Sequence, residues 1–212
     1  MDSKQNLIRP KRIYRVPKIT AWIYPRRIWF GEKAKIYLTF DDGPHPEITP
    51  KLLDLLQNHN VKATFFWLGE NMERYPELLE RAKKEGHTIG FHGFEHLNNR
   101  KFSVDEFQEN FNRGKDLVTH QLYRPPYGEI KRKFTRILAL QNWKIVMWSL
   151  MPYDFDPALS TEVLVSVIKD ELKEKDIVVL HENDKSKDKI FKATEIVIQL
   201  AKEKKWKLTT LI

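Results

Sequence analysis

The chain has 212 residues, of which 41% are hydrophobic and 12% aromatic, and its formal net charge is +8. This composition indicates a globular protein with a substantial core and excludes an intrinsically disordered chain. The sequence has no cysteine, which excludes disulfides and thiolate metal sites, so we expect any metal to be held by His, Asp or Glu.

The positive charge is concentrated in a basic and aromatic N-terminal extension, which we assign to residues 1–33. Residues 1–30 carry eight basic residues and one acidic residue, a net charge of +7, which leaves about +1 for the other 182 residues. No nucleic-acid partner is expected, because no basic stripe continues through the rest of the chain. A solvated basic segment is the simplest interpretation. Contact with an anionic surface is the alternative, since aromatic residues such as Trp22 and Trp29 alternate with the arginines, although such side chains more often pack onto the domain.

No segment predicts export or a membrane crossing. The apolar stretch 19–24 is closed by Pro25 and is too short for the hydrophobic region of a signal peptide. No window approaches the roughly 18 apolar residues of a transmembrane helix. We therefore expect a cytoplasmic protein without a transmembrane segment, and we expect it to be a monomer.

After the extension, short β-branched segments alternate with segments of helical periodicity. Strands are predicted over residues 35–41, 62–68, 87–92, 122–124, 144–150, 176–181 and 207–212. Helices are predicted around the apolar residues of segments 48–56, 78–82, 104–118, 134–139, 163–172 and 190–200. This alternation predicts an α/β fold of parallel strands with right-handed crossovers. Seven units in roughly 180 residues predict a small, incomplete (β/α) barrel forming one domain over residues 34–212.

Polar groups that bind metals or transfer protons follow the ends of five predicted strands. Each is weak evidence alone, since paired acids before Gly43-Pro44 are typical of turns and a lone histidine is more often structural. The carboxyl ends of parallel strands meet at one rim, however, so we expect these side chains to lie close together. They are Asp41 and Asp42, His92 and His96, Arg124, Asp154, and His181.

Part of this set has the composition of a catalytic zinc site. Two imidazoles and one carboxylate bind zinc and leave a position open for water. His92, His96 and one of the two aspartates can supply that set. Zinc lowers the pKa of water towards about 7, and a second carboxylate nearby can accept the proton. The pattern therefore predicts one ligand and one base in the pair Asp41 and Asp42.

These segments resemble the polysaccharide deacetylase family, the NodB-homology domain or carbohydrate esterase family four. TFDDGP (39–44), HGFEH (92–96), RPPYG (124–128), the Trp and Asp of the fifth strand and LH (180–181) have the order and approximate spacing of the family motifs. The resemblance covers about residues 35–212 and implies a distorted (β/α)7 barrel. It also implies a metal-dependent hydrolase of non-peptide carbon–nitrogen bonds. Such an enzyme removes N-acetyl groups from N-acetylglucosamine-containing glycans such as peptidoglycan or chitin-like oligomers.

The resemblance assigns the metal ligands and the general base. Asp42, His92 and His96 would hold a divalent metal, usually zinc, with cobalt and nickel as alternatives. Asp41 would be the general base that takes a proton from the attacking water. Arg124 would orient Asp41 through a charge-assisted hydrogen bond.

The resemblance also assigns the general acid and the walls of the acetyl pocket. His181 would protonate the departing amine, and Asp154 would stabilise the protonated form of His181. The backbone N–H of Tyr127 would stabilise the oxyanion. Phe155 and Leu180 would line the apolar slot for the acetyl methyl group.

The chain departs from the family pattern at three positions, which bear on substrate fit and leave the catalytic groups intact. Gly93 stands where Ser or Thr is usual, Phe155 where Trp is common, and Met151 where Asp is often found. Two alternatives therefore remain open. One is an O-acetyl esterase that acts on acetylated xylan with the same site, and the other is a non-catalytic protein that binds glycans or a surface.

Overall fold

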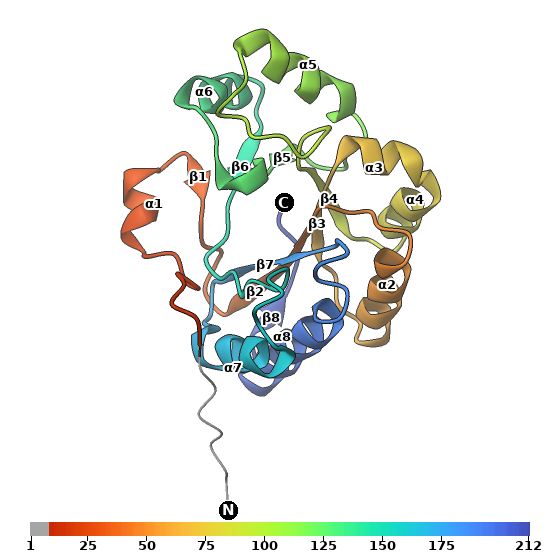
Figure 1. Cartoon of the computed structure of the whole chain (residues 1–212), viewed down its shortest axis with the longest axis vertical. Helices are drawn as coiled ribbons and strands as arrows, with labels where there is room; N and C mark the ends of the chain where they lie inside the picture. The colour runs from red at the N-terminus through yellow and green to blue at the C-terminus, as the bar shows by residue number, and fades with distance from the viewer. Residues whose placement is uncertain (1–8) are drawn as a thin grey trace, which may run out of the picture.

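Short strands and longer helices alternate along residues 9–212, the part of the chain that this computed structural model describes (Figure 1). The first eight residues of the predicted extension lie outside the described residues. The strands are β1 (Arg27–Ile28), β2 (Lys35–Asp41), β3 (Thr64–Trp67), β4 (Thr88–Phe91), β5 (Leu122–Tyr123), β6 (Lys144–Val146), β7 (Ile177–His181) and β8 (Lys207–Leu208). The helices are α1 (Ile19–Ile23), α2 (Ile48–Asn58), α3 (Gly69–Arg74), α4 (Pro76–Lys84), α5 (Val104–Gly114), α6 (Arg132–Leu140), α7 (Thr161–Glu171) and α8 (Ile190–Glu203), with a 3-10 turn η1 (Pro126–Gly128).

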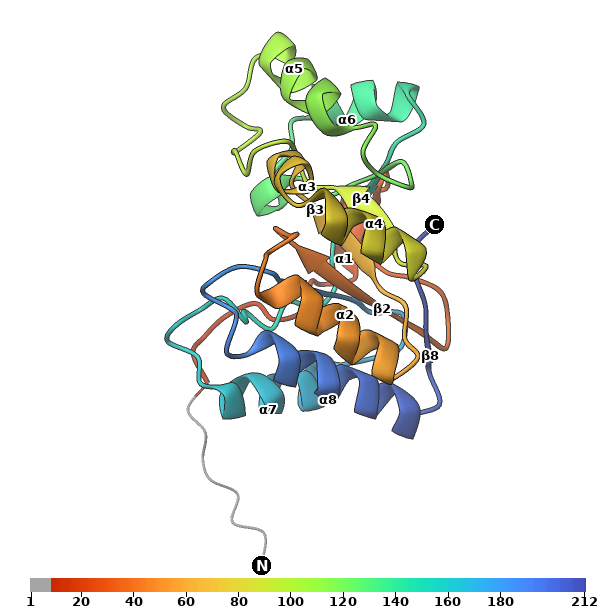
Figure 2. The ribbon, with the colours of Figure 1, turned by 90° about the vertical axis from the view of Figure 1, so that its right-hand side faces the viewer.

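The strands form one curved parallel sheet in the order β1-β6-β5-β4-β3-β2-β7, and β8 pairs with β2. Leu150, which follows β6, forms a parallel bridge with Val178 of β7, so the two sides of the sheet approach each other. Figure 2 shows α2, α7 and α8 on one side of the strands and α5 and α6 on the opposite side. The expected α/β fold, a distorted barrel of parallel strands in a single domain, is thus confirmed.

All seven predicted strands form, but the bounds of several were predicted too long. The segment 144–150 was expected to be one strand, whereas β6 ends at Val146. The carbonyl groups of Val146 and Met147 instead accept hydrogen bonds from the guanidinium of Arg124. A buried arginine that uses main-chain carbonyls in this way takes the place of a neighbouring strand.

Much of the described part of the extension is joined to the barrel. β1 pairs with β6, and the guanidinium of Arg15 donates to both carboxylate oxygens of the fully buried Asp176, at 2.7 and 3.0 Å. The aromatic residues of this segment divide into two groups: Trp29 is 8% exposed and packs in the core, whereas Trp22 is 82% exposed. Contact of the extension with an anionic surface stays a prediction.

Period-two alternation along β2 separates two faces of the sheet. Leu38 and Phe40 join the large apolar cluster that includes the helices, whereas Tyr37 belongs to a smaller cluster with Phe66 and Ile177. Asp41 lies on the same face as Tyr37, at the carboxyl end of the strand. Within residues 9–212, no helix combines the length and the hydrophobicity that a membrane crossing requires.

Candidate active site

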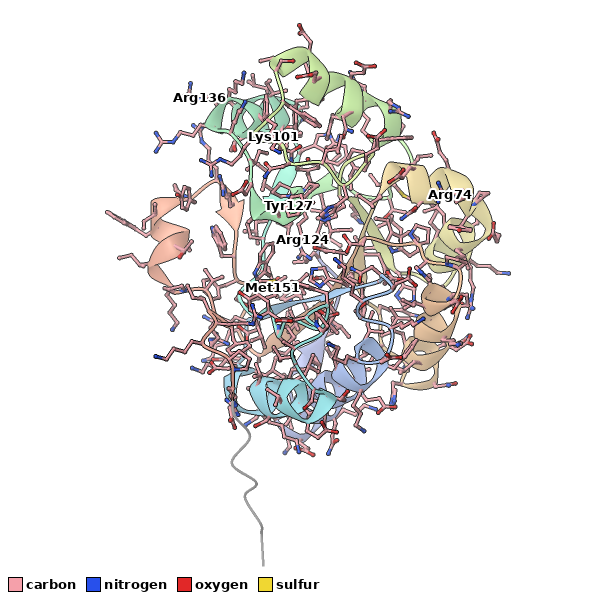
Figure 3. All side chains as sticks on the ribbon, in the orientation of Figure 1. Arg74, Lys101, Arg124, Tyr127, Arg136 and Met151 are labelled. Carbon is pink, nitrogen blue, oxygen red and sulfur yellow. The ribbon has the colours of Figure 1, made fainter. Side chains whose placement is uncertain are left out.

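A cavity of about 610 Å³ opens at the carboxyl ends of the strands. The register of the strands brings two of its residues side by side, because Asp41 of β2 is the cross-strand partner of His181 of β7. Figure 3 places the labelled Arg124, Tyr127 and Met151 near the centre of the molecule in this view. The predicted residues that line the cavity are Asp41, Asp42, His92, His96, Tyr127, Phe155 and His181.

Asp41 is held from inside the barrel by Arg124. Nη1 of Arg124 donates to Oδ1 of Asp41 at 2.6 Å and to Oγ1 of Thr39 at 2.8 Å. Arg124 is fully buried and Asp41 is 2% exposed, so both charges depend on this contact for compensation. The structure therefore brings together Asp41 and Arg124, as the family resemblance implies. The guanidinium stays charged and fixes the position of the carboxylate.

Asp42 faces two imidazoles and has one oxygen without a partner. Oδ1 of Asp42 lies 3.6 Å from Nε2 of His92 and 3.6 Å from Nε2 of His96. This oxygen is buried and accepts no hydrogen bond from the residues that the structure describes. A buried carboxylate oxygen without a partner is costly, so the donor set of one oxygen and two nitrogens fits a divalent cation. These three residues form the one such cluster found among residues 9–212.

The tautomer of His92 also suits a metal ligand. Its Nδ1 lies 2.8 Å from the carbonyl oxygen of Arg124, a contact that requires a proton on Nδ1 and leaves the lone pair on Nε2. Burial lowers the pKa of His92 below its ordinary value, which favours the neutral ring. Metal ligation needs this neutral form.

The backbone explains how two adjacent carboxylates reach one cavity. An extended strand would direct the side chains of Asp41 and Asp42 to opposite faces. The strand ends at Asp41, and Asp42 adopts φ +77°, a left-handed conformation that aspartate tolerates better than most residues. Gly43 follows and leaves no room for a side chain, since a Cβ there would lie 2.4 Å from Nε1 of Trp67.

His181 lines the same cavity and is paired with Asp154. Oδ2 of Asp154 accepts the backbone N–H of His181 at 2.7 Å, and its Oδ1 lies 2.9 Å from Nδ1. Burial alone would lower the pKa of His181, but the charge and hydrogen bond of Asp154 raise it to about 9. The imidazole thus keeps a proton at neutral pH, as a general acid requires.

Aromatic and apolar side chains make the remaining walls. The Tyr127 ring, on a residue with φ +59°, lies edge-on to His96 with 4.5 Å between ring centroids. Phe155 lies edge-on to His181 at 4.6 Å. Leu180 is not among the residues that line the cavity. It is fully buried in the large apolar cluster, because alternation along β7 turns it away from the face that carries His181.

Three further residues near Asp42 received no role from the sequence. Nδ2 of Asn183 donates to Oδ2 of Asp42 at 2.7 Å, and Nδ2 of Asn71 donates to its backbone carbonyl at 2.8 Å. Glu182 is buried beside them and accepts from Nε1 of Trp67 at 2.7 Å. Their position in the sequence could have indicated two of them, since residues 182 and 183 directly follow the end of a strand.

Known proteins resemble this chain in sequence. A family model described as polysaccharide deacetylase matches residues 31–146, more than half of the chain. The chain is 43% identical over 129 residues to a peptidoglycan-N-acetylglucosamine deacetylase of Bacillus cereus, an alignment that covers 58% of this chain and 47% of that protein. The match therefore spans about half the length of that relative. A chitooligosaccharide deacetylase of Azorhizobium caulinodans is 31% identical over 157 residues, 71% of this chain and 74% of that protein.

A solved structure agrees with these matches. The crystal structure of the Bc1960 peptidoglycan N-acetylglucosamine deacetylase, in complex with 4-naphthalen-1-yl-N-oxidanyl-benzamide, superposes with a TM-score of 0.84 at 32% sequence identity. It covers 92% of this chain and 95% of that one. The resemblance drawn from the five motifs is confirmed, and the chain belongs to the polysaccharide deacetylase family.

Proposed function

We propose that this chain is a metal-dependent hydrolase that removes N-acetyl groups from an N-acetylglucosamine-containing glycan. The observation that carries the proposal is the buried, unpartnered Oδ1 of Asp42 between the Nε2 atoms of His92 and His96, beside a carboxylate and an imidazole in separate ion pairs. Metal-assisted hydrolysis of an amide by water requires a set of ligands for the cation and two groups that can transfer protons.

Each residue has a distinct part in the proposed reaction. Asp42, His92 and His96 would hold the cation, zinc or otherwise cobalt or nickel. The bound cation would polarise the acetamide carbonyl and make water a better nucleophile near neutral pH. Asp41 accepts the proton of the attacking water at the oxygen that Arg124 does not hold. The backbone N–H of Tyr127 donates to the oxyanion that develops on the carbonyl.

His181 completes the reaction by donating a proton to the departing nitrogen. An amine leaves poorly as an anion, so breaking the carbon–nitrogen bond needs this proton. Asp154 holds Nδ1 and thereby leaves Nε2 as the ring nitrogen that can donate into the cavity. The expected products are acetate and a glucosamine residue within the glycan.

The substrate class rests on the relatives and on the walls of the cavity. The matched relatives are named for peptidoglycan N-acetylglucosamine and chitooligosaccharide, both of which are N-acetylated glycans. Tyr127, Phe155, Trp148 and Met151 give the cavity the apolar surfaces on which sugar rings and an acetyl methyl group can pack. We therefore propose peptidoglycan or a chitin-like oligomer as the substrate.

Acetate release tests this proposal. The zinc-loaded protein is incubated with peptidoglycan, N-acetylglucosamine oligomers and acetylxylan, with and without a chelator, and Asp42→Ala serves as the matched variant. Chelator-sensitive acetate from the first two substrates, lost in Asp42→Ala, is the expected result. Acetate from acetylxylan alone would identify an O-acetyl esterase, and none from any substrate would leave a non-catalytic glycan-binding protein.

A further inference from the structure

The two oxygens of the Asp42 carboxylate have different surroundings. Oδ2 accepts a hydrogen bond of 2.7 Å from Nδ2 of Asn183, whereas Oδ1 is buried without a partner and faces His92 and His96. A carboxylate free to rotate about its χ2 torsion would turn its plane away from the two imidazoles. The contact of Asn183 with one oxygen therefore fixes the plane of the carboxylate, so that the other oxygen stays directed at His92 and His96.

The orientation of the Asn183 amide is itself fixed by the turn that follows β7. Oδ1 of Asn183 accepts the backbone N–H of Lys185 at 3.0 Å, which assigns oxygen to that end of the amide and nitrogen to the end at Asp42. Oγ of Ser186 accepts the backbone N–H of Asn183 at 3.3 Å. Asn183 thus reaches Asp42 from a hydrogen-bonded turn and offers a donor there.

The main chain of Asp42 is held from the opposite side. Nδ2 of Asn71 donates to the Asp42 carbonyl at 2.8 Å, and the backbone N–H of Leu68 donates to the Gly43 carbonyl at 3.0 Å. A left-handed conformation such as that of Asp42, at φ +77°, is disfavoured for a residue with a side chain and persists where its surroundings hold it. Asn71 is one of the groups that hold it.

We propose that Asn183 and Asn71 are positioning residues of the metal site, which fix the carboxylate and the backbone of Asp42 so that Oδ1 is presented to the cation. The inference rests on the proposed function only in taking Asp42, His92 and His96 as the metal ligands. Groups that orient a ligand in this way typically contribute about 10–100-fold to metal affinity. Asn183 lines the cavity and Asn71 does not, but the inference uses only their contacts with Asp42.

The test measures zinc and cobalt affinity, by competition with a chromophoric chelator, for the full chain without substrate. Asn183→Ser is the main variant, since a serine hydroxyl can still accept the N–H of Lys185 but is too short to reach Asp42. We expect zinc binding about 10–100-fold weaker than in the wild type, with altered visible absorption of the cobalt form. Asn71→Ala, which leaves the carboxylate contact in place, is expected to weaken binding in the same direction.

The chain offers a matched control in Asn98. Its Oδ1 also accepts the backbone N–H two residues ahead, at 2.9 Å, and its Nδ2 also donates to a carboxylate, that of Glu129, at 2.7 Å. Glu129 is not in the metal cluster, so Asn98→Ser should bind zinc within about twofold of the wild type.

Three results would overturn the inference: unchanged affinity in Asn183→Ser, an equal loss in Asn98→Ser, or no zinc or cobalt binding by the wild type. If Asn183→Ser fails to fold, Asn71→Ala with unchanged affinity would overturn it as well. Because no substrate is present, a wild type that binds zinc but releases no acetate would contradict the proposed function and leave this inference standing.

Discussion

Asp41 and Asp154 are both buried carboxylates beside one cavity, and they differ in the cation that each one faces. Asp41 faces the guanidinium of Arg124 at 2.6 Å, which keeps its proton at any ordinary pH. Asp154 faces the imidazole of His181 at 2.9 Å, which can lose its proton. A permanent cation has no proton to give up, whereas a titratable partner can itself become the proton donor. In the proposed reaction, one of these carboxylates is the base and the other supports the acid.

Removing the base should have the largest effect. Asn at position 41 still accepts a hydrogen bond from Arg124 but cannot take a proton from water. We expect kcat for acetate release to fall by about 10⁴-fold in Asp41→Asn, with bound zinc unchanged. Steady-state kinetics and metal analysis of the same preparation measure both quantities. If zinc were lost together with activity, Asp41 would be a ligand and not the base.

Removing the acid should distinguish amide from ester substrates. His181→Ala lacks the proton that an amine leaving group needs, so we expect about a 10³-fold fall in kcat on N-acetylglucosamine oligomers. An activated aryl acetate, whose leaving group departs without protonation, should lose far less rate. The ratio of the two losses, measured with one enzyme preparation, is the readout. Equal losses on both substrates would argue against proton donation by His181.

Weakening the pair of His181 and Asp154 should shift the pH at which kcat falls on the alkaline side, and leave Asp41 and His181 in place. In the proposed reaction His181 acts in its protonated form, so its contribution should be present below its pKa of about 9 and be lost as pH rises through that value. Asp154→Asn removes the charge that raises this pKa, which should then fall towards the ordinary value of about 6.5. We expect about a 30-fold loss of kcat at pH 8 and little loss at pH 6. A uniform loss across the pH profile would contradict this account of Asp154.

Position in the fold decided how much of the site could be predicted from the sequence. Asp41, His92 and His181 could be placed at one rim because strand ends converge in any parallel barrel. The left-handed backbone of Asp42 and its contact with Asn183 could not be predicted from the sequence. Both depend on how the loops after β2 and β7 meet. The bounds of β6 failed for a similar reason, since only the fold brings Arg124 to the carbonyls of Val146 and Met147.

A third buried carboxylate, Glu182, extends the comparison to a group that lacks a cationic partner among the described residues. It accepts hydrogen bonds from the neutral side chains of Trp67 and Thr49. Burial raises its pKa to about 7, above the ordinary value of about 4.3 in an unfolded chain. The folded state therefore binds the proton more tightly, and its stability should fall as pH rises from about 4.5 to about 7.

Glu182→Gln tests whether the raised pKa of Glu182 lowers stability as pH rises. Of the variants, it should have the smallest effect on catalysis. Glutamine cannot ionise, so the free energy of unfolding of the variant should lack the decrease that Glu182 causes between about pH 4.5 and 7. Relative to the wild type, the variant should gain on the order of 1–3 kcal/mol across that interval, as measured by urea unfolding of the metal-free proteins at several pH values. Parallel curves for the two proteins would mean that Glu182 is stabilised as an anion. Neutral hydrogen-bond donors would then be enough to stabilise a buried carboxylate, which in the case of Asp41 is done by an arginine. The difference between carboxylates with and without a cationic partner would then disappear.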